Sequence, residues 1–141
     1  MNIVFDTNVL LSAVLWKGKP HQALAFVLQN HTLPQSKDTL SEFKNVLSRN
    51  KFKRILEGRN LSKDSIVESL IETSTLYEVP ESIKTLSNTI KIEDADDLMF
   101  IELALSCYSK LIISGDDHLL SLKKVFGIDI LTVHDFLKLN L

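Results

Sequence analysis

The sequence has little of several residue types, and each shortage excludes a class of protein. Its 141 residues include one cysteine, Cys107, which excludes a disulfide framework and a cysteine-based zinc site. Four glycines and three prolines are too few for a fibrous or low-complexity chain. No apolar run approaches the roughly 18 residues of a membrane span. The first residues turn acidic at Asp6, too soon for a signal peptide, so we expect a cytoplasmic protein.

What is present is the composition of one globular domain. Hydrophobic residues make up 45% of the chain and charged residues 24%, far from the disordered range. A chain of this length buries roughly two thirds of its unfolded surface, so it can fold without disulfides or metals as staples. No repeat and no linker rich in Pro, Gly or Ser divides it. We therefore expect a single domain over residues 1–141.

Charges of each sign are concentrated in one segment, although the net charge is only −2. Between residues 44 and 63 the only acid is Glu57, and the basic residues are Lys44, Arg49, Lys51, Lys53, Arg54, Arg59 and Lys63. Residues 93–102 reverse this pattern, with acids and no Lys or Arg. Each segment is consistent with a solvated helix face, or with a local field that attracts a ligand of opposite charge.

Short apolar runs alternate with segments of helical periodicity. Residues 2–5, 110–114 and 128–133 are typical of buried strands, and residues 32–36 and 76–79 are weaker strand candidates. The helix starts that we expect are marked by Pro20, by Asp38 or Thr39, by Ser62, and by Asp94 or Asp96. A last helix is expected over residues 134–139. This alternation predicts a parallel sheet covered by helices, in which ligands bind outside the carboxyl ends of the strands.

Four acids stand near the ends of the expected elements: Asp6, Glu42, Asp97 and Asp116. If the strands share one sheet, these carboxylates can converge at its carboxyl edge, where they would repel one another. A Mg²⁺ or Mn²⁺ ion prefers such oxygen ligands, and it can activate water against a phosphodiester. Each acid taken alone is better explained as a helix cap or a turn residue. Only their joint placement favours a metal site.

Four motifs follow one another along the chain. The first is an apolar strand followed by Asp-Thr-Asn at residues 6–8, and the second runs from Ser36 through Glu42 to Leu47. The third spans residues 93–104 and the fourth residues 111–120, before a closing segment at 130–137. In this order they resemble the motifs of the PIN-domain family, in particular the VapC-like toxins of toxin–antitoxin pairs. Two departures are the lack of a proline in the third motif and a serine, Ser114, where threonine is common.

The resemblance implies a Rossmann-like, three-layer α/β/α fold with a central parallel sheet of about four or five strands. It also implies a metal-dependent endoribonuclease that acts as the toxin of a type II toxin–antitoxin pair. The acids placed around Mg²⁺ or Mn²⁺ would be Asp6, Glu42, Asp97 and Asp116, with Asn8 and Ser114 as supporting polar residues. The basic segment would hold RNA phosphates, and the residues expected to do so are Arg49, Lys51, Lys53, Arg54 and Arg59.

Two other functions remain open at this point. A phosphotransfer or phosphatase domain could use Asp6 as nucleophile, but such enzymes usually carry a second Asp where this chain has Asn8. A catalytically inactive interaction protein is the other alternative, although all four acids are present. Among the remaining polar residues, Asp96 and Asp117 are expected to face solvent, although either could assist a second metal ion. His118 could reach a metal at this edge, but a lone histidine in such a place is more often a surface residue.

Assembly is expected on the same resemblance, which implies a homodimer and a small antitoxin partner. Six large apolar residues on or near the early helices could form either an interface or core: Trp16, Phe26, Leu28, Phe52, Ile55 and Leu56. We expect the dimer contact within residues 10–60. An arginine of the antitoxin could pair bidentately with the four acids and displace the metal.

Overall fold

The computed structural model describes residues 1–140, so the expected domain, residues 1–141, extends one residue past this range. Its elements in chain order are β1 (Val4–Phe5), α1 (Thr7–Leu15), α2 (Lys19–Asn30), β2 (Leu33–Gln35), α3 (Lys37–Leu47), α4 (Asn50–Gly58), α5 (Lys63–Thr73), β3 (Ser74–Leu76), α6 (Glu81–Ser87), the 3₁₀ helix η1 (Ala95–Asp97), α7 (Leu98–Ser106), β4 (Leu111–Ile113), α8 (Asp117–Leu120), β5 (Lys124–Val125), β6 (Ile128–Leu131) and α9 (Val133–Asn140). Within the described range, no helix is both long and apolar enough to cross a membrane.

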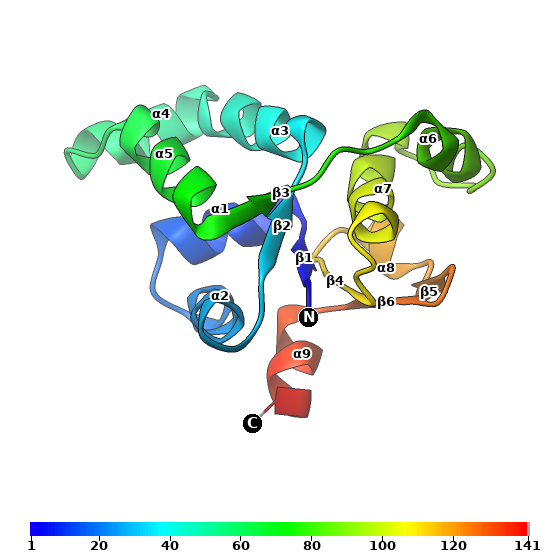
Figure 1. Ribbon diagram of the computed structural model, residues 1–141. Coiled ribbons are helices and arrows are strands. Elements are labelled where there is room, and N and C mark those ends of the chain that lie inside the picture. Colours follow the sequence, from blue (N-terminus) through cyan, green and yellow to red (C-terminus); the bar gives the residue numbers. More distant parts are fainter. Residues whose placement is uncertain (141) are drawn as a thin grey trace.

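A four-stranded sheet with the order β1-β4-β6-β5 forms the centre of the fold (Figure 1). β1, β4 and β6 are parallel, and the two-residue edge strand β5 pairs antiparallel with β6. β2 and β3 form a second, parallel pair, and a bridge between Asn2 and Thr32 connects β2 to the start of the chain. The expected α/β class with a mostly parallel sheet is confirmed. The antiparallel β5 was not predicted, because two residues carry no periodicity.

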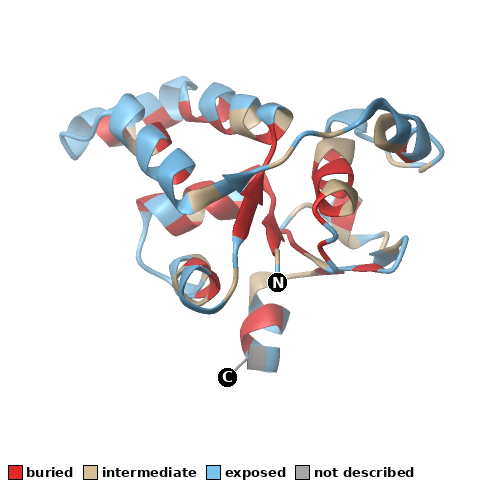
Figure 2. Ribbon diagram, in the orientation of Figure 1, coloured by how far each residue is buried: buried red, intermediate tan, exposed pale blue. Residues whose placement is uncertain are grey.

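Helices cover both faces of the sheet because successive strand residues point in opposite directions. In β1, Phe5 packs in one apolar cluster with α1, α2 and α3, whereas Val4 packs in another with α7. In β4, Ile113 and Ile112 divide between the same two clusters. β1 and β4 are therefore buried between two layers of helices, as Figure 2 shows, which is the three-layer α/β/α arrangement.

Two of the expected element boundaries were wrong, and the strand expected over residues 128–133 ends early, at Leu131, because Val133 is the first residue of α9. Ser36 caps α3, accepting a hydrogen bond from the Thr39 amide at 3.2 Å while Thr39 Oγ1 accepts from the Ser36 amide, so the helix begins before Asp38. The strand expected at residues 76–79 lies at Ser74–Leu76, where pairing with β2 fixes it directly after α5. Pro20 in the first turn of α2 and Ser62 as the cap of α5 are confirmed.

The fold places strand ends side by side at one edge. β1 and β4 are hydrogen-bonded neighbours, and the Asp6 amide donates to the Ile113 carbonyl at 2.9 Å. Asp6 and Asp116 follow these two strands, while Glu42 comes from α3 and Asp97 from the start of α7. This edge is the carboxyl end of the parallel strands, where α/β folds bind their ligands.

Candidate metal centre

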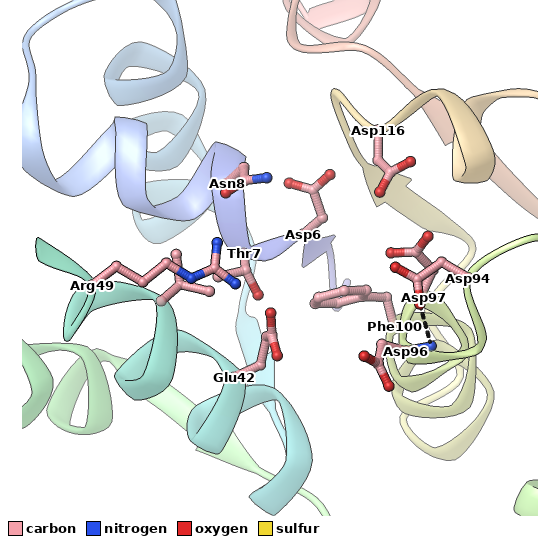
Figure 3. A pocket seen from close by; sticks show the side chains of 11 residues that line it. Asp6, Thr7, Asn8, Glu42, Arg49, Asp94, Asp96, Asp97, Phe100 and Asp116 are labelled. Carbon is pink, nitrogen blue, oxygen red and sulfur yellow. Dashed lines mark hydrogen bonds between the residues drawn. The ribbon is translucent and has the colours of Figure 1, made fainter. Parts of the chain in front are cut away.

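A pocket of ≈ 250 Å³ opens at the carboxyl edge of the sheet (Figure 3). The acids that line it are Asp6, Glu42, Asp94, Asp96, Asp97 and Asp116. Asn8, Thr7 and Arg49 also line it, and Phe100 contributes an aromatic ring. All four acids singled out in the sequence thus face one cavity. Asp96, which was expected to face solvent, is exposed but also lines the pocket, whereas Asp117 does not.

Asp6 is held rigidly by hydrogen bonds to both of its carboxylate oxygens. The Val9 amide donates to Oδ1 at 2.8 Å, and the Gly115 amide donates to Oδ2 at 3.1 Å. The hydroxyl of Ser114, which is fully buried, also donates to Oδ2. Burial raises the pKa of Asp6, although these hydrogen bonds act in the opposite direction. Ser114 does not line the pocket, so its structural part is to position Asp6.

Asp116 and Asp94 serve as caps and also line the pocket. Asp116 Oδ1 accepts from the amide of His118 at 2.8 Å at the start of α8, and Asp94 Oδ1 accepts from the Asp96 amide at 3.0 Å. Each of these acids can therefore be both a helix cap and a ligand-binding acid, because the cap occupies one carboxylate oxygen and leaves the second available.

Asp97 has no such structural explanation. It stands at the N-cap position of α7, but its side chain makes no capping hydrogen bond. The residue is 8% exposed, and its buried Oδ2 has no hydrogen-bond partner within the described residues. Burial, reinforced by the charge of Asp116, raises the pKa of Asp97 to about 7. A buried carboxylate oxygen without a partner is costly unless a cation or a proton satisfies it.

The donor set fits a divalent cation. Ligand atoms of Asp94, Asp97 and His118 all lie within 4.8 Å of one another, and Asp116 approaches the same histidine. The carboxylates are the hard oxygen donors that Mg²⁺ and Mn²⁺ take, and the unpartnered Asp97 oxygen is the atom that a cation would satisfy. Sequence reasoning set His118 aside. The sequence feature that could have pointed to His118 is its position two residues after Asp116, in the first turn of the next helix.

Of the five residues expected to bind RNA, only Arg49 lines the pocket. Arg59 is occupied elsewhere, since its guanidinium donates to the Leu15 carbonyl and lies 5.5 Å from the Trp16 ring centre. Lys51 lies over the ring of Phe52 at 5.4 Å. The basic segment is therefore not a uniform surface, and its contact with the acidic pocket is made at the start of α4.

The metal-free protein is expected to become less stable as the pH rises. Because the pKa of Asp97 is raised from 3.8 to about 7 on folding, the native state keeps a proton that the unfolded chain has already released. The free energy of unfolding therefore falls between about pH 4 and about pH 7, and the raised pKa of Asp6 acts in the same direction. Thermal unfolding in EDTA at about pH 5.5 and about pH 8 measures this. A higher midpoint at the alkaline value would contradict it.

The family assignment comes from comparison with known proteins. The family model described as a PIN domain matches residues 2–118 of this chain. Because that match spans most of the sequence, the chain belongs to the PIN domain family. A search of curated protein sequences finds no match.

Solved structures share the fold at low sequence identity. A chain of VapBC2 from Rickettsia felis, crystallised with a DNA fragment from its promoter, is similar with a TM-score of 0.69 and 13% identity over 94% of this chain and 98% of that one. Mycobacterium tuberculosis VapC20, a sarcin–ricin loop cleaving toxin, is similar with a TM-score of 0.61 and 11% sequence identity, over 90% of this chain and 98% of that one. A chain of VapBC-1 from nontypeable Haemophilus influenzae is similar with a TM-score of 0.59 and 20% sequence identity, over 95% of this chain and 99% of that one. At such identities the likeness establishes the fold alone.

Proposed function

We propose that this PIN-domain protein is a Mg²⁺- or Mn²⁺-dependent endoribonuclease. The observation that carries the proposal is the buried, unpartnered Oδ2 of Asp97 among five other acids in one pocket. A bound cation would satisfy that oxygen, offset the mutual repulsion of the carboxylates and hold the charged oxygens of a phosphodiester. Family membership supports the same chemistry.

The proposed roles of the residues follow from their contacts. Asp6, Glu42, Asp97 and Asp116 would hold the cation directly or through water. Asp6 is fixed by Ser114 and by two backbone amides, so its position is set before any ligand arrives. Glu42 faces the pocket from α3, across from Asp97 (Figure 3), and would orient an attacking water. When bound, the cation supplies charge neutralisation and a more acidic water.

Incubation of the purified protein with single-stranded RNA tests this proposal. We expect internal cleavage with Mn²⁺ or Mg²⁺ and none with EDTA, because the carboxylates alone cannot neutralise the developing phosphate charge. A gel of end-labelled RNA measures the products. Cleavage that persists undiminished in EDTA would refute the metal dependence, and no cleavage with either ion across varied RNAs would favour the inactive interaction protein.

We further propose that the chain is the toxin of a toxin–antitoxin pair. The similarity in fold to VapC20, a sarcin–ricin loop cleaving toxin, and to chains of VapBC complexes supports this. An inhibiting partner would block the pocket with an arginine paired to its carboxylates, in place of the metal. A complex that still binds Mn²⁺ at full affinity would contradict that mode of inhibition.

The proposed homodimer would use the exposed part of the early helices. Trp16 and Leu28 are 40% and 41% exposed, whereas Phe52 and Leu56 are buried in the core and cannot serve an interface in this conformation. Val14 and Leu28 also line an apolar groove of ≈ 260 Å³ between α1, α2 and α5. We expect light scattering at tens of micromolar to give twice the 16.0 kDa chain mass. A monomer would contradict the dimer.

No observation favours a phosphotransfer enzyme with Asp6 as nucleophile. Both carboxylate oxygens of Asp6 already accept hydrogen bonds, which lowers their reactivity toward phosphorus. The endoribonuclease gives a task to each of Asp6, Glu42, Asp97 and Asp116, and the nucleophile role would leave Glu42 and Asp97 without one.

A further inference from the structure

The imidazole of His118 lies beside Asp97 and Asp116, two acids that line the pocket, although the histidine itself does not line it. Nε2 lies 2.9 Å from Glu93 Oε2, within hydrogen-bond distance. Nδ1 lies 3.6 Å from the unpartnered Oδ2 of Asp97 and 3.7 Å from Asp116 Oδ1, too far for a hydrogen bond to either. The side chain of His118 is 40% exposed, whereas the Oδ2 of Asp97 that faces it is buried.

The contact with Glu93 decides which nitrogen is free. A carboxylate accepts only, so Nε2 must carry the proton that it donates to Glu93. In the neutral ring Nδ1 then has a lone pair, and that lone pair faces the same space as the carboxylate oxygens of Asp97 and Asp116. With Asp97 ionised, Nδ1, Asp97 Oδ2 and Asp116 Oδ1 are three lone-pair donors around one space, and such a set is suited to a cation. A carboxylate on the outer nitrogen of a histidine whose inner nitrogen faces a metal is a common arrangement in metalloproteins.

We propose that His118 supplies a nitrogen ligand, through Nδ1, to the divalent cation held by Asp97 and its neighbours, and that this ligand makes the site select Mn²⁺ over Mg²⁺. The inference rests on the proposed function, because it concerns the same cation. Mg²⁺ prefers oxygen donors in a strict octahedron, whereas transition ions accept imidazole. An all-carboxylate site discriminates poorly between the two ions, so the histidine is the residue that determines specificity.

Manganese binding measured by electron paramagnetic resonance tests this directly. Pulsed spectra of wild-type protein with Mn²⁺ should show coupling to a directly bound nitrogen, and His118→Gln should abolish it. Mn²⁺ affinity should fall about tenfold or more in this variant. Mg²⁺ affinity, measured by competition with Mn²⁺, should stay within about twofold. The matched control is His134→Gln, an exposed histidine on α9, which should keep the nitrogen coupling and the affinity.

Two results would overturn the proposal, and they separate it from the proposed function. If Mn²⁺ binds without nitrogen coupling and His118→Gln binds it as tightly as wild type, the histidine is no ligand, while the carboxylate site stands. If wild type binds no Mn²⁺ at all, both the ligand role and the metal-dependent nuclease fail. The nitrogen coupling is read in wild-type protein, so the test does not depend on the variant folding.

Discussion

Replacing Asp97 by asparagine is expected to lower the rate of RNA cleavage by about 10³-fold and to abolish tight Mn²⁺ binding. The change removes one negative charge at the carboxylate whose Oδ2 is buried without a partner, and it keeps the size of the side chain. Single-turnover cleavage and calorimetric titration with Mn²⁺ measure the two effects.

A gain in stability should accompany this loss of function. Without metal, asparagine removes a carboxylate whose burial raises its pKa to about 7, so the variant should unfold at a higher temperature than wild type at about pH 8. Asp117→Asn is the matched control, since Asp117 is an exposed neighbour of Asp116 that does not line the pocket. Equal Mn²⁺ affinity in Asp97→Asn and wild type would contradict the assignment of Asp97 as a metal ligand.

The sequence predicted four of the acids that line the pocket, because their positions depend on local features. Asp6 directly follows one apolar run and Asp116 comes three residues after another; both runs were predicted to be buried strands, and the carboxyl ends of neighbouring parallel strands meet at one edge. Asp97 lies at the start of an apolar helix, within an acidic segment. These features mark the end of a strand or the start of a helix. The prediction of the acids therefore does not depend on the boundaries of α3 and β3, which were wrong by one or two residues.

Side-chain placement depends on tertiary packing, and there the sequence was insufficient. His118 lies beside Asp97 and Asp116 because α8 begins a few residues after β4, and Glu93 approaches it from another segment, a contact between residues 25 positions apart. The basic segment likewise looked uniform. Hydrophobic periodicity does not predict that Arg59 contacts the Leu15 carbonyl and the Trp16 ring, whereas Arg49 faces the pocket.

Arg49 should therefore differ in effect from every other basic residue of its segment. Its guanidinium makes no hydrogen bond or ion pair within residues 1–140, and it extends toward the pocket beside Thr7 and Glu42 (Figure 3). Such an arginine can donate two parallel hydrogen bonds to a phosphate while the acids hold the metal. We expect Arg49→Ala to lower kcat/KM for RNA about 10- to 100-fold, because a change of this size corresponds to the free energy of one hydrogen bond between charged groups.

The comparison variant is Arg54→Ala, because Arg54 is exposed on the same helix and carries the same charge but does not line the pocket. It should change kcat/KM by no more than about threefold at physiological salt, as expected for a rim charge. Arg49→Lys should recover only part of the loss, since a lysine keeps the charge without the planar fork. Mn²⁺ affinity should be no weaker in Arg49→Ala than in wild type, because the arginine faces the phosphate and its charge opposes the cation. Equal losses in Arg49→Ala and Arg54→Ala would mean that RNA is held by the general field of α4, and the assignment of Arg49 to the pocket would then be wrong.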